Sequence, residues 1–227
     1  MRGPIIIGLA AGAAALVVWQ QWRAQQMSDA APGWSWDGLG LKVFTDAADV
    51  ITDAVTETGA TVGAMIGLGP KASEYAAMLN ESNVQAFLQV IRDGEGTAGA
   101  MGYQTMVGGG LFYDMADHPR QFVAIRSGNT TIRSSAAGAY QMLSRTWDEA
   151  KSAMGLPDFS PASQDIAALF LINRRGALDD VRAGRLDAAI RRTAKEWASL
   201  PGSPYGQPTR TMAQASNVYQ SAGGVIA

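Results

Sequence analysis

The sequence has no cysteine and only one histidine, His118. Without cysteine the protein can neither form disulfide bonds nor use a thiolate as a nucleophile. Because protein zinc sites are built mainly from histidine and cysteine, this composition also argues against a zinc centre held by the chain alone. Such a chain can function unchanged in an oxidising compartment such as the periplasm.

Positive charge is also scarce. The 18 lysine and arginine residues are outnumbered by 20 acidic residues, which gives a net charge of −2. Residues 1–80 carry four basic and seven acidic side chains, and residues 81–227 carry fourteen and thirteen. Neither part has the basic excess with which proteins bind nucleic acid, so nucleic acid is not an expected partner. A hydrophobic content of 47% with 17% charged residues is typical of a folded chain.

There is one long hydrophobic run, at residues 3–19, where seventeen positions carry no charge. This length is at the short end for a helix that spans a bilayer. Trp22 follows the run as an interfacial anchor would, and Gly8 and Gly12 have a spacing that lets helices approach closely in a membrane. We expect residues 1–23 to form an uncleaved N-terminal transmembrane helix that can self-associate through these glycines. A cleaved signal peptide is the alternative.

Residues 24–80 are expected to link this helix to the rest of the chain. Within them, residues 41–58 place apolar side chains on one helical face and four acidic side chains on the other, which predicts an amphipathic helix. Its acidic face favours packing on a partner or on the protein's own domain over binding to anionic lipid. Residues 59–70 are apolar but too short and too rich in glycine for a second membrane span.

From residue 81 to residue 227 the pattern indicates one compact, mainly helical (α+β) domain with a small strand or loop region. The glycine-rich residues 98–116 suit short strands or irregular loops better than a helix. The remaining expected elements are a helix over 119–125 capped by Asp117, a turn and helix over 135–147 with Tyr140 and Gln141 at the helix start, helices over 160–175, 186–197 and 209–221, and a loop over 199–208.

The most informative stretch of this domain is an apolar stripe that ends at a glycine-flanked glutamate. The stripe has the i, i+3, i+4, i+7 spacing of one helical face: Val84, Phe87, Leu88 and Ile91. Gly94 then supplies a helix stop, which places Glu95 just past a helix C-terminus. The partial negative charge of that terminus disfavours a carboxylate, so a partly desolvated Glu95 would hold a proton near neutral pH, as a general acid must. The simpler alternative is a surface glutamate in a turn.

Residues 83–224 resemble the endolysins of lambda-like bacteriophages. The matching stretches, in order, are Glu95-Gly96-Thr97, Gly102-Tyr103, Val107-Gly108-Gly109, Leu111-Phe112, Asp117-His118-Pro119-Arg120, Ala137-Gly138, Tyr140-Gln141, Leu143-Ser144-Arg145, Asp158-Phe159-Ser160-Pro161, Ser163-Gln164-Asp165, Arg175-Gly176-Ala177-Leu178, Trp197-Ala198-Ser199-Leu200-Pro201-Gly202 and Tyr205-Gly206-Gln207. The resemblance covers roughly two thirds of the chain and leaves out the first 80 residues. It implies a lysozyme-like fold and a peptidoglycan lytic transglycosylase that acts on glycan strands and needs no metal or organic cofactor.

In such an enzyme one glutamic acid does the work of two carboxyl groups. It protonates the glycosidic oxygen between N-acetylmuramic acid and N-acetylglucosamine, and then takes the proton of the muramyl C6 hydroxyl, which closes onto C1 as a 1,6-anhydro sugar. The residue of this sequence that matches is Glu95. The resemblance also implies substrate-binding roles for Gln141 and for four other groove residues, namely Tyr103, Tyr140, Tyr205 and Gln207. Helix packing is the alternative for Tyr140, and an ordinary surface position is the alternative for Tyr103, Tyr205 and Gln207.

The sequence departs from the family's pattern at three positions, Met101, Gln104 and Gly110, where relatives commonly carry a histidine or an acidic residue. The loss of these acids weakens a two-carboxylate mechanism. A muramidase that hydrolyses the same bond with help from Asp114 or Asp117 nevertheless stays open. A non-catalytic, wall-binding virion protein that retains this fold is a further alternative.

His118, between Asp117 and Pro119, is expected to be structural, and Trp147 and Trp197 are expected in the core. The expected location is a bacterial inner membrane or a virion, with the catalytic domain facing the periplasm and the wall. The role would then be host lysis or entry of the phage genome.

Overall fold

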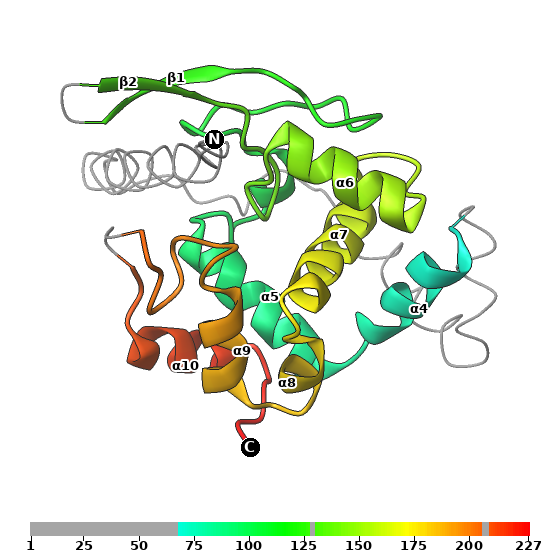
Figure 1. Ribbon diagram of the computed structural model, residues 1–227, viewed down its shortest axis with the longest axis vertical. Coiled ribbons are helices and arrows are strands. Elements are labelled where there is room, and N and C mark those ends of the chain that lie inside the picture. Colours follow the sequence, from blue (N-terminus) through cyan, green and yellow to red (C-terminus); the bar gives the residue numbers. More distant parts are fainter. Residues whose placement is uncertain (1–67, 128–129, 206–208) are drawn as a thin grey trace, which may run out of the picture.

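The structure is a computed structural model, and it describes residues 68–127, 130–205 and 209–227 (Figure 1). The expected transmembrane helix over 1–23, the contact through Gly8 and Gly12, and the amphipathic helix over 41–58 lie outside these residues. Within the described ranges, every helix is too short or too polar to cross a bilayer.

Helix α5, Ser82–Gly94, runs through the middle of the molecule (Figure 1). Its apolar stripe is buried as the spacing predicts, since Val84, Phe87 and Ile91 have no exposed surface and Leu88 retains 5%. Helices α8, Leu178–Arg182, and α10, Met212–Ser221, pack against α5. Full burial of one such side chain stabilises a fold by about 1.5–3 kcal/mol, so this stripe contributes much of the core.

Helix α7, Pro161–Arg174, is the second central element and begins where the sequence predicts. The Ser160 side chain accepts a hydrogen bond from the backbone nitrogen of Ser163, and Pro161 occupies the first turn, where its missing N–H costs no hydrogen bond. Helix α9, Leu186–Thr193, ends earlier than predicted, so Trp197 lies in the turn that follows it. Trp147 and Trp197 are 0% and 4% exposed, which confirms them as core residues.

Helix α4, Pro70–Met78, precedes residue 81 and packs against α7. Ala72 and Tyr75 belong to the main hydrophobic core, and the Tyr75 hydroxyl accepts a 2.7 Å hydrogen bond from Asn173 Nδ2. The core of the described part of the chain therefore includes residues on the N-terminal side of residue 81.

A two-stranded antiparallel sheet lies at one edge of the molecule (Figure 1). Strand β1, Val123–Ser127, pairs with β2, Thr130–Ser134, in the register Val123 to Ser134 and Ile125 to Ile132. The helix predicted over 119–125 is therefore wrong. Arg120 has a φ of 51°, which is outside the right-handed helical region, and the β-branched residues that follow pair across the hairpin.

The segment before helix α6, Ser144–Met154, also differs from the prediction. Tyr140 and Gln141 were expected at the start of a helix, but they lie in a turn closed by the backbone bridge between Ala137 and Met142. Gln141 has a φ of 48°, a left-handed conformation that a helix cannot contain. The short 3-10 helix η1, Gly102–Gln104, and the bridge between Thr105 and Leu111 agree with irregular structure over 98–116.

Candidate active site

Glu95 occupies the end of α5, where a Schellman motif fixes its position. Its backbone nitrogen donates to the carbonyl of Ile91 at 2.8 Å, and the Thr97 nitrogen donates back to the Arg92 carbonyl at 2.8 Å. Gly96 has the φ of 68° that this motif requires one residue past the helix cap. The Glu-Gly-Thr sequence thus directs the Glu95 side chain into the interior, where it has no exposed surface.

The Glu95 carboxyl group is suited to hold a proton. Burial raises its pKa from 4.5 to about 8, although a hydrogen bond from Ser199 opposes this shift. Ser199 Oγ donates to Glu95 Oε1 at 2.7 Å, while Oε2 has no partner among the described residues. Sequence reasoning missed Ser199 as a site residue, because its only signal was membership in the matching stretch 197–202.

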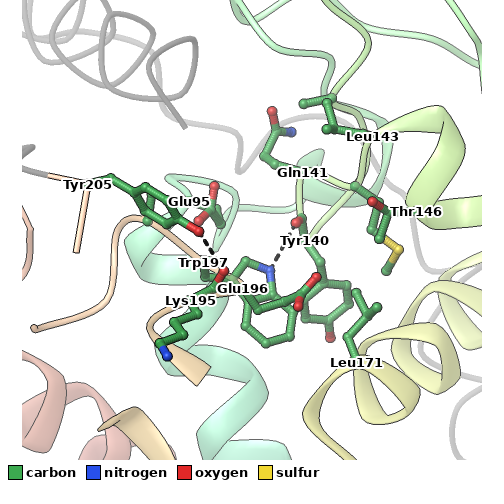
Figure 2. Close-up of a pocket in the computed structure, with 13 residues that line it drawn as sticks. Glu95, Tyr140, Gln141, Leu143, Thr146, Leu171, Lys195, Glu196, Trp197 and Tyr205 are labelled. Carbon is green, nitrogen blue, oxygen red and sulfur yellow. Dashed lines mark hydrogen bonds between the residues drawn. The ribbon is translucent and has the colours of Figure 1, made fainter. Parts of the chain in front are cut away.

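A small cavity adjoins Glu95 (Figure 2). Its other walls come from the turn that holds Gln141 and from the segment after α9, which includes Trp197, Ala198 and Tyr205. The cavity holds about 70 Å³. A buried water needs about 10–15 Å³ on this measure, whereas small-molecule sites are typically about 300 Å³ or larger. The space beside Glu95 therefore has room for a few waters and is smaller than a typical site for a sugar ring.

Gln141 lies in the wall of this cavity with one polar atom unused. Its Nε2 donates to the carbonyls of Thr105 at 3.0 Å and Gly138 at 2.9 Å, which holds the amide plane in place. The buried Oε1 has no partner among the described residues. An amide oxygen held in this way can accept a hydrogen bond from an N–H or O–H group of a ligand.

Tyr140 and Tyr103 meet at Asp165 rather than at Glu95. Their hydroxyls both donate to Asp165 Oδ1, at 2.6 Å from Tyr140 and 2.9 Å from Tyr103. Tyr140 is 2% exposed and contributes to the cavity wall, while its backbone carbonyl accepts from Trp197 Nε1 at 3.2 Å. Tyr103 is not part of that wall. The packing role weighed for Tyr140 is thus the role that its contacts support.

Tyr205 borders the cavity, and its hydroxyl donates to the Lys195 carbonyl at 3.0 Å (Figure 2). Gln207, the other residue expected in this loop, lies outside the described residues.

The carboxylates considered for a muramidase lie elsewhere. Neither Asp114 nor Asp117 lines the Glu95 cavity. Partial burial would raise the pKa of Asp117, but hydrogen bonds from Trp147, Arg120 and Lys151 outweigh it and hold the pKa well below the usual range. Glu196 is the one further carboxylate among the described residues of the wall, and both of its oxygens are bound, by Arg174 and Arg175.

His118 has the structural role that the sequence indicates. It is 3% exposed, with Nε2 3.0 Å from the Met142 carbonyl, and Nδ1 accepts from the Arg120 backbone nitrogen at 3.0 Å. Both ring nitrogens are therefore used within the fold. Across the described ranges, no three histidine, aspartate or glutamate side chains converge as metal ligands would.

Comparison with known proteins connects this site to a family. The endolysin family model matches residues 85–226, which include Glu95, Gln141, Ser199 and Tyr205. The chain belongs to the endolysin family. It is 42% identical over 148 residues to the endolysin of Escherichia phage lambda, across 63% of this chain and 92% of that protein. It is also 42% identical over 159 residues to the endolysin of Escherichia phage P2, across 64% and 95% of the two chains.

Solved structures agree with this assignment. Bacteriophage lambda lysozyme in complex with a chitohexasaccharide matches with a TM-score of 0.60 at 39% identity, across 64% of this endolysin and 97% of that chain. A second structure of lysozyme from bacteriophage lambda matches with a TM-score of 0.56 at the same identity and coverage. The fold expected from the resemblance, a mainly helical lysozyme-like domain with a small sheet, is therefore confirmed.

Proposed function

We propose that this endolysin is a peptidoglycan lytic transglycosylase with Glu95 as its single acid and base. The observation that carries the proposal is that Glu95 is a buried carboxyl with a pKa raised to about 8. No second carboxylate with a free oxygen lines its cavity within the described part of the chain. A hydrolase normally needs two carboxyl groups, whereas a transglycosylase can return the proton to the same one. The relative bound to a chitohexasaccharide supports a glycan substrate.

In the first step, protonated Glu95 donates to the glycosidic oxygen between N-acetylmuramic acid and N-acetylglucosamine. The bond from C1 to this oxygen breaks, its electron pair stays with the leaving oxygen, and positive charge develops at C1. In the second step, the Glu95 carboxylate takes the proton of the muramyl C6 hydroxyl while that oxygen bonds to C1. The product is a 1,6-anhydro sugar, water is not consumed, and Glu95 is protonated again.

Ser199 and Gln141 support this cycle in different ways. The Ser199 hydroxyl donates to Glu95 Oε1, so it stabilises the carboxylate that forms after the first proton transfer. The free Oε1 of Gln141 is suited to accept a hydrogen bond from an N-acetyl N–H or a sugar hydroxyl. Gln141 would then orient the sugar ring beside Glu95.

The test is mass spectrometry of the muropeptides that the purified protein releases from sacculi, beside its Glu95→Gln variant. We expect products that end in 1,6-anhydro-muramic acid, and we expect the variant to release at least about 10²-fold less. Reducing ends in place of anhydro ends would assign the protein as a muramidase. Binding to sacculi without any Glu95-dependent product would instead identify a wall-binding structural protein.

We further propose that residues 1–23 tether the enzyme to the inner membrane or a virion, with the catalytic domain facing the wall. The seventeen uncharged positions at residues 3–19 support this proposal. Cell fractionation of the full chain beside a variant that lacks residues 1–23 tests it, since only the full chain should sediment with membranes. Equal amounts of the two proteins in the soluble fraction would reject the tether.

A further inference from the structure

A second, larger cavity lies on the other side of Tyr140 from Glu95. It holds about 750 Å³, about the size of typical small-molecule sites. Among the residues that the structure describes, Tyr140 is the one that lines both cavities. The other lining residues come from α5, η1, α7 and α10 and from the turn before α5: Leu79, Asn80, Gln85, Leu88, Gln89, Arg92, Tyr103, Pro161, Asp165 and Ala222.

One face of α5 supplies a polar stripe to this second cavity. Gln85, Gln89 and Arg92 lie at i, i+4 and i+7, so their side chains follow one another along the helix toward Tyr103. Gln85 Nε2 donates to the Leu79 carbonyl at 2.8 Å, whereas Gln89 makes no side-chain hydrogen bond to any described residue. Side-chain amides spaced along a groove are suited to pair with the N–H and C=O groups of a peptide backbone.

Arg92 ends this stripe with a charge that no described carboxylate pairs directly. Its guanidinium stacks 4.6 Å from the centre of the Tyr103 ring, and Nη1 contacts the Tyr103 hydroxyl at 3.5 Å. Its Nε is buried without a hydrogen bond to any described group. By contrast, Arg174 and Arg182 on the surface bind glutamates directly. Nη2 has no hydrogen bond to a described residue and is not among the buried unpaired atoms, so on this cavity wall it is the donor suited to bind a carboxylate.

Asp165 lies across Tyr103 from Arg92 and supplies the opposite charge. Its Oδ1 accepts both tyrosine hydroxyls, and Oδ2 has no hydrogen bond to a described residue. Burial raises the pKa of Asp165 to about 6, while hydrogen bonds from Tyr140 and Tyr103 and the charge of Arg92 oppose this shift. Oδ2 is therefore an acceptor without a described partner, and it lies in the same cavity wall as an arginine that no described carboxylate pairs. This arrangement matches an N–H group followed by a carboxylate.

We propose that this second cavity binds the carboxylate end of a short peptide, with the terminal carboxylate on Arg92 and the preceding N–H on Asp165. The stem peptides of the bacterial wall belong to this class of ligand. Their assignment as the source rests on the proposed function, whereas the peptide site itself does not. Engagement of a stem would give the enzyme a second contact with its substrate, separate from the glycan contact at Glu95.

Calorimetric titration of the full-length protein tests the site directly. The probe is N-acetyl-D-alanyl-D-alanine, and the matched probe is the same dipeptide with its C-terminal carboxyl amidated. We expect the acid to bind, and we expect amidation or Arg92→Gln to weaken binding at least about tenfold, since each removes a charge-assisted interaction. Arg191→Gln is the control, because the Arg191 side chain is 69% exposed and does not line this cavity, so its loss removes the same charge without affecting the site. Equal binding of both probes, or no loss in Arg92→Gln while its melting temperature is retained, would overturn the proposal.

A second experiment distinguishes this inference from the proposed function. Cleavage is measured on intact sacculi and on glycan strands whose peptides an amidase has removed. We expect Arg92→Gln to raise KM on intact sacculi by about tenfold and to leave cleavage of stripped strands unchanged. If Arg92→Gln changed cleavage of intact sacculi and of stripped strands equally, Arg92 would be a structural residue, and the stem peptide of the wall would be rejected as the ligand of this cavity. If the wild-type protein cleaves neither substrate, the proposed function fails, and the dipeptide titration still decides whether the cavity binds peptides.

Discussion

Glu95 is costly to ionise in this fold because its buried carboxylate would have one hydrogen-bond donor among the described residues. Its side chain has no exposed surface, Ser199 contacts Oε1, and Oε2 has no described partner. A buried carboxylate of this kind is stabilised far less than the same group in water. The protonated acid is therefore the resting form at neutral pH, and a proton must leave before Glu95 can act as a base.

This environment gives Glu95→Gln a pH-dependent effect on stability. Between pH 4.5 and 8, Glu95 is ionised in the unfolded chain but protonated in the folded protein. The folded state then binds more protons, so the free energy of unfolding falls as pH rises, by at most about 1.4 kcal/mol per pH unit. Urea denaturation at about pH 5, 6.5 and 8 measures this effect. The free energy of unfolding of Glu95→Gln, relative to that of the wild type, should increase with pH. A difference that is constant with pH would mean that Glu95 ionises normally.

Ser199 is expected to set the upper pH limit of activity. Its hydrogen bond lowers the pKa of Glu95, so Ser199→Ala should raise this pKa further. The alkaline limb of the kcat/KM profile, which reports the acid of the free enzyme, should then move to higher pH. Ser203→Ala is a matched control in the same loop, because its hydroxyl has no described partner. If both variants keep the wild-type limb, the Ser199 hydroxyl does not act on Glu95.

At the scale of elements, periodic patterns in the sequence predicted the two central helices. The stripe that ends at Ile91 gave α5, and the Ser160-Pro161 cap gave the start of α7. The hairpin was missed because residues 119–125 are too few to separate a helical period from a strand period. No local sequence pattern predicts the left-handed φ values of Arg120 and Gln141, because neither residue is a glycine.

Without the family resemblance, Glu95 was the one site residue that the sequence placed, because the end of a helix determines its position. Glu95 was expected at a helix end because Gly94 was expected to stop the helix. Gly94 is instead the last residue of α5, and Gly96 has the positive φ of the Schellman motif, but Glu95 lies at the helix end in either case. The directions of Tyr103 and Tyr140 depend on Asp165, which is 62 and 25 residues away in sequence. Ser199 reaches Glu95 across 104 residues. Pairings at such separations come from packing of the whole fold, which periodicity does not encode.

Gln164 is the residue of α7 that holds the turn bearing Gln141 in place. It has no exposed surface, its Nε2 donates to the carbonyls of Tyr103 and Phe159, and its Oε1 accepts from the Ala139 nitrogen at 2.8 Å. Gln164→Met keeps the volume but leaves these backbone groups without partners. We expect a loss of about 3 kcal/mol or more in the free energy of unfolding.

Chemical denaturation measures this loss, and Gln121→Met is the control, because Gln121 is exposed and has no side-chain hydrogen bond to a described residue. A loss below about 1 kcal/mol in Gln164→Met would mean that the turn does not depend on α7.

For the molecule as a whole, the cavity beside the proposed catalytic residue is smaller than the second cavity, although it is the one that should hold a sugar. The cavity at Glu95 holds about 70 Å³, and the cavity at Arg92 holds about 750 Å³. Since the space beside Glu95 is smaller than a sugar ring needs, we expect the walls that carry Gln141 and Tyr205 to move apart when a glycan binds. On the Tyr205 side, Ser199 is bonded to Glu95, and the Tyr205 hydroxyl is bonded to the Lys195 carbonyl within the same segment after α9.

Opening before binding has a kinetic signature that a chitohexasaccharide can reveal. Trp197 lines the cavity, so mixing of the Glu95→Gln variant with this oligosaccharide in a stopped-flow fluorimeter should report entry. If the closed state must open first, the observed rate levels off at high ligand concentration. Adding Tyr205→Phe removes the bond to the Lys195 carbonyl and should change this plateau toward faster opening. A rate that rises linearly to the highest concentration, alike in both proteins, would contradict an opening step.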